Sequence, residues 1–143
     1  MLEKLRRRSG EETGFTLVEL LVVMLILGIL AAIAIPSFFN QRNKARDADA
    51  KASVRTAQTA IETFATDNNG SYAGVTAANL QTIEPTLTGK TITVTSTANS
   101  YTVTVASAVA GQSFSITRAA NGTTTFPCLA VGTYGCPASG FWA

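Results

Sequence analysis

The sequence of 143 residues contains no histidine, two cysteines and one tryptophan. Histidine is the most frequent acid–base group in catalysis and a frequent metal ligand. Residues 70–143 also contain no phosphate-cradling glycine loop and no pair of carboxylates, and no base accompanies the many serine and threonine hydroxyls. We therefore expect no enzymatic activity, no catalytic or metal site and no cofactor.

Charged side chains are scarce in the C-terminal part of the chain. Between Pro85 and Ala143 the only acids or bases are Lys90 and Arg118. The net charge of +2 is too small to indicate nucleic-acid binding as the main activity, and no direct nucleic-acid binding is predicted. A domain with so little charge either stays soluble through hydroxyl and backbone groups or packs against copies of itself.

The two cysteines, Cys128 and Cys136, are eight residues apart near the C-terminus. An even number of cysteines in a chain with an export signal predicts one disulfide, and the alternative is two free thiols. A loop of this size would be stabilised by about 2–3 kcal/mol. A structural zinc site would need more ligands.

Residues 15–35 form a nearly uninterrupted apolar run, FTLVELLVVMLILGILAAIAI. As a helix this run would be about 31 Å long, which matches the hydrocarbon thickness of a bilayer. The basic residues at positions 4 and 6–8 precede the run, and by the positive-inside rule they predict an N-terminus in the cytoplasm. Five further cations between residues 42 and 55 argue weakly for the opposite orientation.

Glu19 lies inside this apolar run, where a carboxylate costs at least a few kcal/mol near the bilayer centre. A local explanation is a capping box, because Thr16 and Glu19 have the T-x-x-E spacing of a helix N-terminus. An acid in the first turn also suits the helix dipole. Capping does not explain why pure hydrocarbon follows the acid.

The residues GFTLVE at positions 14–19, followed by the apolar run to Pro36, resemble the class III signal of type IV pilins and their pseudopilin relatives. The resemblance covers about 60 residues through the helix. It implies that a prepilin peptidase cuts between Gly14 and Phe15 and methylates the new amino group of Phe15. Glu11 and Glu12 depart from the pattern, because many relatives carry a basic residue just before the glycine.

The resemblance also implies a second role for Glu19. A buried carboxylate is stable beside a compensating cation, and removal of the leader would leave a positive amine on Phe15. In a filament of staggered helices, Glu19 of one subunit would pair with the Phe15 amine of its neighbour and fix the register. The implied partners are copies of the chain in a helical filament, the prepilin peptidase, an inner-membrane platform protein, an assembly ATPase and membrane lipid before assembly.

Two residues predict a helix break near the membrane exit. Pro36 lacks an N–H group and restricts Ile35, and Gly28 is a weak helix former. Both lie where the family often has them. We expect the segment between them to loosen during assembly, and the alternative is a plain kink at the membrane exit.

Beyond Pro36 an amphipathic helix is predicted to continue. Its apolar positions recur at spacings of three and four: Val54, Ala57, Ile61, Phe64 and Ala65. Its polar face is predicted to contain Arg46, Asp47, Asp49, Lys51, Arg55 and Glu62. Gly70 would end this helix in the left-handed conformation, and the D-N-N-G sequence before it lacks the glutamate of a calcium loop.

The C-terminal part predicts a small antiparallel sheet. A short helix from Thr76 to Glu84 comes first, and alternating apolar positions then indicate three or four strands, with turns at residues 98–99 and 121–122. The expected class is α+β: a long N-terminal helix packed on a sheet, as in type IV pilins. Its expected segments are a cleaved leader (1–14), a transmembrane and assembly segment (15–36), an amphipathic segment (37–69) and the head (70–143).

The uncharged tail ends in large aromatic groups, Tyr134, Phe141 and Trp142. One interpretation is that these groups cover the open edge of the sheet. The other is an exposed apolar patch that contacts another subunit or a surface.

Three functions remain compatible with the sequence. The preferred one is a structural subunit of a type IV pilus, inserted in the cytoplasmic membrane as a precursor and extracellular after assembly, where it would serve adhesion, surface motility or DNA uptake. The alternatives are a pseudopilin of a type II secretion or competence system, and a membrane-anchored monomer that binds a ligand. The tail lacks the carboxylates with which related pseudopilins hold calcium, which favours the pilin.

Overall fold

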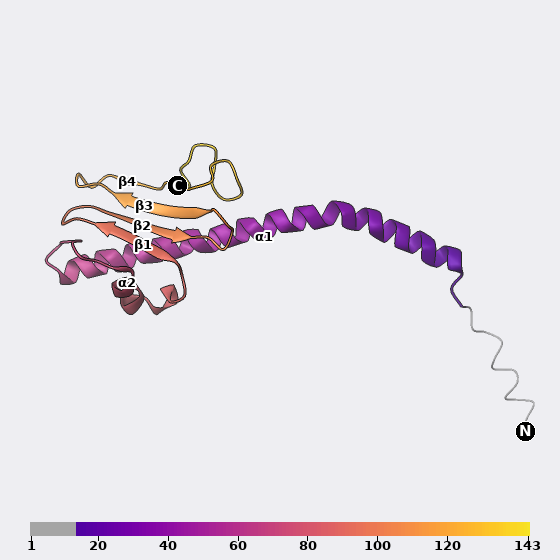
Figure 1. The fold of residues 1–143 in the computed structure, drawn as a ribbon, viewed down its shortest axis with the longest axis horizontal. Coiled ribbons are helices and arrows are strands. Elements are labelled where there is room, and N and C mark those ends of the chain that lie inside the picture. Colours follow the sequence, from indigo (N-terminus) through magenta and orange to yellow (C-terminus); the bar gives the residue numbers. More distant parts are fainter. Residues whose placement is uncertain (1–13) are drawn as a thin grey trace, which may run out of the picture. The chain divides into compact units, whose positions relative to one another are not determined.

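The structure, a computed structural model, describes residues 14–143. The expected leader, except for Gly14, lies outside the described residues. The chain divides into two compact units, Met1–Phe38 and Phe39–Ala143, and each is described by itself. Helix α1 (Leu17–Asp67) contributes to both units (Figure 1).

The first unit consists, in its described part, of the apolar start of α1. Its large hydrophobic side chains are exposed throughout, from Phe15 at 77% to Phe38 at 66%. An 18-residue window of α1 has a mean hydropathy of 2.9 and none of it is buried, so this helix is long and apolar enough to cross a membrane. In water such a surface is unstable, and it requires lipid or other apolar helices as its environment.

Helix α1 contains Gly28 and Pro36 without an interruption. The helix is therefore not interrupted at these two residues in the isolated chain, whereas a kink at the membrane exit stays a prediction. Proline removes one backbone hydrogen bond, but the turns on both sides keep the helix, as is common in membrane helices. Loosening of this segment during assembly stays a prediction.

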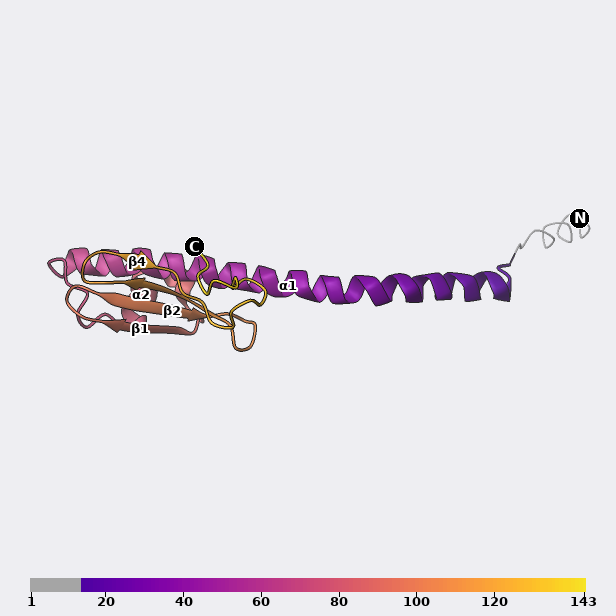
Figure 2. The same cartoon turned by 90° about the horizontal axis from the view of Figure 1, so that it is seen from above.

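The second unit contains the C-terminal part of α1 and a four-stranded sheet, which lies along one side of that part of the helix (Figures 1 and 2). The strands are β1 (Ile92–Ser96), β2 (Tyr101–Ala106), β3 (Ser113–Arg118) and β4 (Thr124–Thr125). They are antiparallel and adjacent in chain order, so the sheet is a simple meander. In its register Val103 lies opposite both Val94 and Ile116.

The core of the second unit lies between the sheet and α1. Alternate residues of β2 and β3 point into it: Tyr101, Val103, Val105, Phe114 and Ile116. The helix contributes Val54, Ala57 and Ile61, all fully buried, and Phe64 packs against the cluster. The period of two in the strands and the three-and-four spacing in the helix therefore predicted both faces of this core.

Local signals place the connection between helix and sheet. Gly70 has a φ of 81° and follows Asn69, whose φ is 55°, so both residues are left-handed at the end of α1. Helix α2 (Ala77–Ile83) is capped by the Thr76 side chain, and the 3-10 helix η1 (Pro85–Leu87) begins at the proline. These predictions for Gly70, Thr76 and Pro85 are confirmed.

The architecture is thus α+β, with a long N-terminal helix packed on a small antiparallel sheet. The predicted class is confirmed.

Candidate functional site

The N-terminal end of α1 carries the predicted assembly residues. The Glu19 backbone N–H donates to Thr16 Oγ1 at 3.2 Å, and the Thr16 N–H donates to Glu19 Oε2 at 3.5 Å. The two residues therefore form the reciprocal capping box that their spacing predicts. This confirms capping as one role of Glu19.

The predicted processing residues are accessible in the isolated chain. Gly14, Phe15 and Glu19 are all exposed, and an added Cβ on Gly14 would meet no atom within 4 Å. Cleavage between Gly14 and Phe15, methylation of Phe15 and pairing of Glu19 with a neighbour stay predictions.

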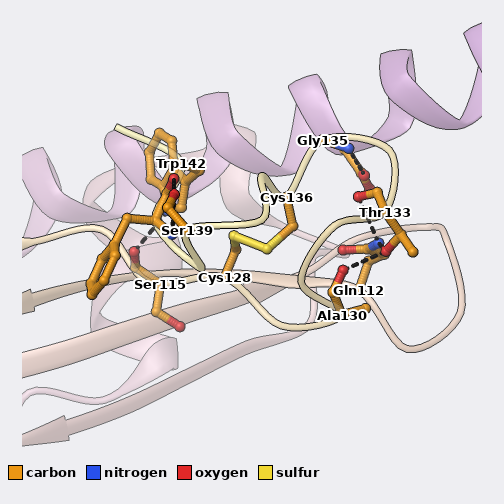
Figure 3. Close-up of a disulfide and its surroundings, with 11 residues drawn as sticks. Gln112, Ser115, Cys128, Ala130, Thr133, Gly135, Cys136, Ser139 and Trp142 are labelled. Carbon is orange, nitrogen blue, oxygen red and sulfur yellow. Dashed lines mark hydrogen bonds between the residues drawn. A yellow bond between two sulfur atoms is a disulfide. The ribbon is translucent and has the colours of Figure 1, made fainter.

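The second candidate site is the C-terminal loop of the second unit. Cys128 and Cys136 form a disulfide, as predicted (Figure 3). Cys136 is buried, and Cys128 packs against the core cluster. The bridge therefore ties the loop to the interior of the unit.

Asp47 of α1 holds this loop by hydrogen bonds. Its side chain is fully buried; Oδ2 accepts the Gly135 backbone N–H at 2.9 Å, and Oδ1 accepts the Ser107 hydroxyl at 2.6 Å. A Cβ added to Gly135 would come within 2.6 Å of the Asp47 Cβ. Asp47 was predicted on the polar face of the helix, whereas it is buried against the C-terminal loop; its partners are remote in sequence, so helical spacing does not reveal them.

Gln112, which is also buried, reaches the same loop. Its Nε2 donates to the backbone oxygen and to Oγ1 of Thr133, at 3.2 and 2.5 Å. Thr133 in turn donates its hydroxyl to the carbonyl of Ala130 (Figure 3). The loop is thus fixed by side chains from α1 and from the end of the β2–β3 connection.

The aromatic groups of the tail divide between the two predicted roles. Trp142 packs on the core cluster, and its Nε1 donates to the backbone oxygen of Ser115 at 3.0 Å. Its ring lies edge-to-face to Phe114 and to Phe126, with centroids 6.1 and 5.4 Å apart. Tyr134 and Phe141 remain exposed. Trp142 therefore covers the edge of the sheet, whereas Tyr134 and Phe141 belong to an exposed patch.

Two cations of α1 lie over these rings. Lys51 Nζ is 5.1 Å from the Phe114 ring and 5.8 Å from that of Trp142, and the Arg55 guanidinium is 5.0 Å from the Trp142 ring. Cation–π contacts of this kind each contribute about 0.5–1 kcal/mol at exposed sites. They attach the C-terminal tail to the helix.

Glu62 binds two tyrosines at the other end of the unit. Tyr72 donates its hydroxyl to Oε2 at 2.9 Å, and Tyr101 donates its hydroxyl to Oε1 at 3.0 Å. Burial, followed by the charge and the hydrogen bond of Glu62, raises the pKa of Tyr101 well above its ordinary value of 10.0. Burial and Glu62 also raise the pKa of Tyr72, whereas the nearby Arg118 lowers it.

Sequence reasoning assigned both Asp47 and Glu62 to the polar face and missed these contacts. Asp47 lies three residues before Ala50 and seven before Val54, in register with the apolar face. That register was the signal that could have identified Asp47 as buried.

Comparison with known proteins identifies the family. The model of the prokaryotic N-terminal methylation motif matches residues 11–35. The model described as "Type IV minor pilin ComP, DNA uptake sequence receptor" matches residues 36–132, which is more than half of the chain. Together with the helix-and-sheet architecture, these matches define a type IV pilin-like protein. The chain belongs to the ComP family of type IV minor pilins.

Similarity to individual proteins covers mainly the helix. The chain is 39% identical over 61 residues to the type IV major pilin protein PilA of Myxococcus xanthus, which covers 43% of this chain and 28% of the relative. It is 39% identical over 72 residues to the type IV major fimbrial protein FimA of Dichelobacter nodosus, which covers 48% and 46%. It is 36% identical over 58 residues to the type II secretion system core protein G of Pseudomonas aeruginosa, which covers 41% of each chain.

The chain thus spans less than half the length of these relatives. No solved structure matches it.

Proposed function

We propose that the chain is a structural subunit of a type IV pilus, inserted in the membrane as a precursor and polymerised into a helical surface filament. The observation that carries this proposal is the start of α1: a capped, fully exposed apolar helix that the methylation-motif model matches. Such a helix is stable in lipid before assembly and among copies of itself afterwards. The head remains outside this bundle and is available for adhesion, motility or DNA uptake.

Processing would precede assembly. Prepilin peptidase would cut the precursor between Gly14 and Phe15 and methylate Phe15, while the basic leader keeps the N-terminus in the cytoplasm. Exposure of both residues is compatible with access by the peptidase. An inner-membrane platform protein and an assembly ATPase would then supply the force, because a helix this apolar cannot leave lipid unaided.

The experiment compares cells that produce wild type with cells that produce Gly14→Ala. The substitution should leave uncut precursor in the membrane and abolish surface filaments. Ser9→Ala, in the same leader, is the matched control and should leave cutting and filaments unchanged. Normal filaments from Gly14→Ala would overturn the proposal.

Glu19 would set the axial register of the filament. Its carboxylate is exposed in the isolated chain, so it is sterically free to meet the Phe15 amine of a neighbouring subunit. In a dry filament core this ion pair would favour the one stagger in which neither charge is left alone.

The composition of the C-terminal tail favours a pilus subunit over a secretion pseudopilin. Residues 127–143 contain no acid or base, and the disulfide together with Asp47 holds the loop in place. The resemblance to pseudopilins implies a calcium site held by carboxylates in this region, and the loop has no carboxylate side chain for one. Loss of surface filaments with normal protein secretion in a deletion strain would support the pilus, and the converse phenotype would support the pseudopilus.

DNA capture is a second candidate function. The family description names a DNA uptake sequence receptor, and Lys51 and Arg55 of α1 lie over the rings of Phe114 and Trp142. Cations next to aromatic rings are typical of nucleic-acid-binding surfaces, although the net charge of +2 is small for this role. Fluorescence anisotropy with duplex DNA at two salt concentrations tests this candidate, and binding that Arg55→Gln weakens would support it.

A further inference from the structure

An exposed apolar patch lies on the C-terminal loop. Within residues 40–143, all of which the structure describes, the exposed large hydrophobic side chains all fall between positions 129 and 141. They are Leu129 (61% exposed), Val131 (54%), Tyr134 (43%) and Phe141 (51%), and we call them the tail patch. Apart from Phe39 at its helical end, the rest of the second unit exposes no large hydrophobic side chain, so the patch is a local feature that requires an explanation.

The shape of the tail patch is fixed before anything binds to it. The disulfide closes the loop, Asp47 holds Gly135, and Gln112 holds Thr133. Ala130 and Tyr134 have φ values of 59° and 47°, in the left-handed region that non-glycine residues rarely adopt. Such conformations persist where the surroundings impose them, and they cluster at functional sites.

The loop is also suited to a medium of low polarity. Residues 127–143 contain no acidic or basic side chain, so no side-chain charge of this segment would have to be desolvated. The backbone N–H groups of Gly132, Thr133 and Cys136 donate to carbonyl oxygens inside the loop. Transfer of these N–H groups from water to a less polar medium therefore costs little free energy, because each keeps its hydrogen-bond partner.

Two cations lie close in sequence to the residue that holds the loop. Arg42 and Lys44 are exposed on α1 and precede Asp47, the residue that holds the loop. Asp47 follows Ile35, the last residue of the apolar run, by twelve positions. A chain anchored by that run therefore keeps the loop within a few tens of ångströms of the membrane surface, at high effective concentration.

We propose that, in the membrane-anchored precursor, the tail patch lies in the interfacial layer of an anionic lipid bilayer, with Arg42 and Lys44 bound to lipid phosphates. The proposal rests on the membrane anchoring described under Proposed function. Tyrosine and phenylalanine among aliphatic side chains match the composition of the membrane interface, and neighbouring cations match its anionic headgroups. Assembly into a filament would remove the patch from lipid.

A second copy of the chain fits the patch less well. In a helical filament the patch of one copy would meet a different surface of the next, and apart from the patch itself residues 40–143 expose no large hydrophobic side chain that could match it. An anionic bilayer can instead contact the apolar patch with its acyl chains and the cations with its phosphate groups.

The test uses the full chain in vesicles of phosphatidylethanolamine and phosphatidylglycerol. Trp142 is the only tryptophan of the sequence and follows Phe141 directly, so its fluorescence reports on the patch. Lipids brominated near the headgroup should quench Trp142. A second reporter, Thr97→Trp in a Trp142→Phe background, lies in the β1–β2 turn at the opposite end of β2 and should be quenched much less.

Variants then test whether the quenching of Trp142 depends on the side chains of the tail patch. Replacement of Leu129, Val131 and Phe141 by serine should reduce Trp142 quenching to the level of the Thr97→Trp reporter. The matched control replaces three exposed alanines of the far turns by serine, Ala98, Ala119 and Ala120, and should change nothing. If the patch variant does not fold, Arg42→Gln with Lys44→Gln gives an independent test, because it should reduce quenching only in anionic vesicles.

The remaining outcomes are distinct. Equal quenching of both reporters, or undiminished quenching in the patch variant, would overturn the proposal. Quenching that grows with the density of the chain in the vesicle would assign the patch to a second copy and would also overturn it. A chain that alkaline carbonate extracts from vesicles would refute the membrane anchor itself. A chain that resists extraction but shows no quenching of Trp142 would refute the patch proposal alone.

Discussion

Asp47 and Gly135, 88 positions apart in the sequence, are joined by a hydrogen bond from the Gly135 backbone N–H to Asp47 Oδ2. The carboxylate is fully buried and also accepts the hydroxyl of Ser107. This arrangement connects α1, the β2–β3 connection and the disulfide loop at one residue. The position of the tail therefore depends on the helix as well as on its disulfide.

Asp47→Ala should destabilise the second unit by about 1–3 kcal/mol, because it leaves partly buried donors on Gly135 and Ser107 without an acceptor. The measurement is urea unfolding of the full chain in detergent micelles, followed by Trp142 fluorescence. Asp47→Asn is the control of similar shape. It retains one acceptor oxygen and should cost less than Asp47→Ala. Equal stability of Asp47→Ala and wild type would contradict the role of this residue.

Removal of the disulfide by the double substitution Cys128→Ser and Cys136→Ser should lower the free energy of unfolding by about 2–3 kcal/mol, because the unfolded chain gains the entropy of the opened loop. Unfolding in urea measures this difference. Wild type treated with a reductant serves as the matched comparison and should lose a similar amount. A variant as stable as oxidised wild type would show that the loop is held without the bridge.

The Glu62 site predicts a loss of stability at alkaline pH. The pKa of Tyr101 is raised in the folded chain. Below pH 10.0, the ordinary pKa, Tyr101 is protonated in both the folded and the unfolded chain, so its full contribution to stability is present. As the pH rises above that value the unfolded chain releases the proton first, so stability falls by about 1.4 kcal/mol per pH unit.

Tyr101→Phe should remove this part of the alkaline loss, and Tyr72→Phe should remove a smaller part. Unfolding free energies measured across the alkaline range, together with ultraviolet absorbance of tyrosinate, test both variants. An identical alkaline slope in wild type and Tyr101→Phe would contradict the assignment.

The two roles of Glu19 can be separated by substitution. Glu19→Gln keeps a side chain that can complete the capping box with Thr16 but removes the charge. Thr16→Ala removes the cap and keeps the charge. If the carboxylate sets the filament register, Glu19→Gln should be processed normally yet form few or no filaments, whereas Thr16→Ala should still form them. Electron microscopy of surface filaments measures the outcome, and normal filaments from Glu19→Gln would contradict the register role.

Much of the fold followed from local patterns in the sequence. The three-and-four spacing of Val54, Ala57 and Ile61 predicted the buried face of α1, and the alternation in β2 and β3 predicted the core face of the sheet. The Thr16 and Thr76 caps were predicted from residue type and spacing alone. These features depend on neighbours within a few positions, which a single sequence displays directly.

Other features depend on contacts between distant positions. Asp47 and Glu62 were assigned to the polar face without these partners, because local spacing contains no information about Gly135, which is 88 positions from Asp47, or about Tyr101, which is 39 from Glu62. Pro36 was predicted to kink or interrupt α1, and the helix continues through it because the turns on either side outweigh one missing hydrogen bond; a kink there stays a prediction. The two interpretations of the tail could not be decided until the structure placed Trp142 inside and Phe141 outside.

Mass spectrometry of the N-terminal peptide of the processed protein tests the central proposal most directly. We predict a mature chain that begins at Phe15 with one methyl group on its amine. A mature chain that begins at any other residue, or that keeps the residues before Phe15, would leave Glu19 without the proposed cationic partner and would contradict the account.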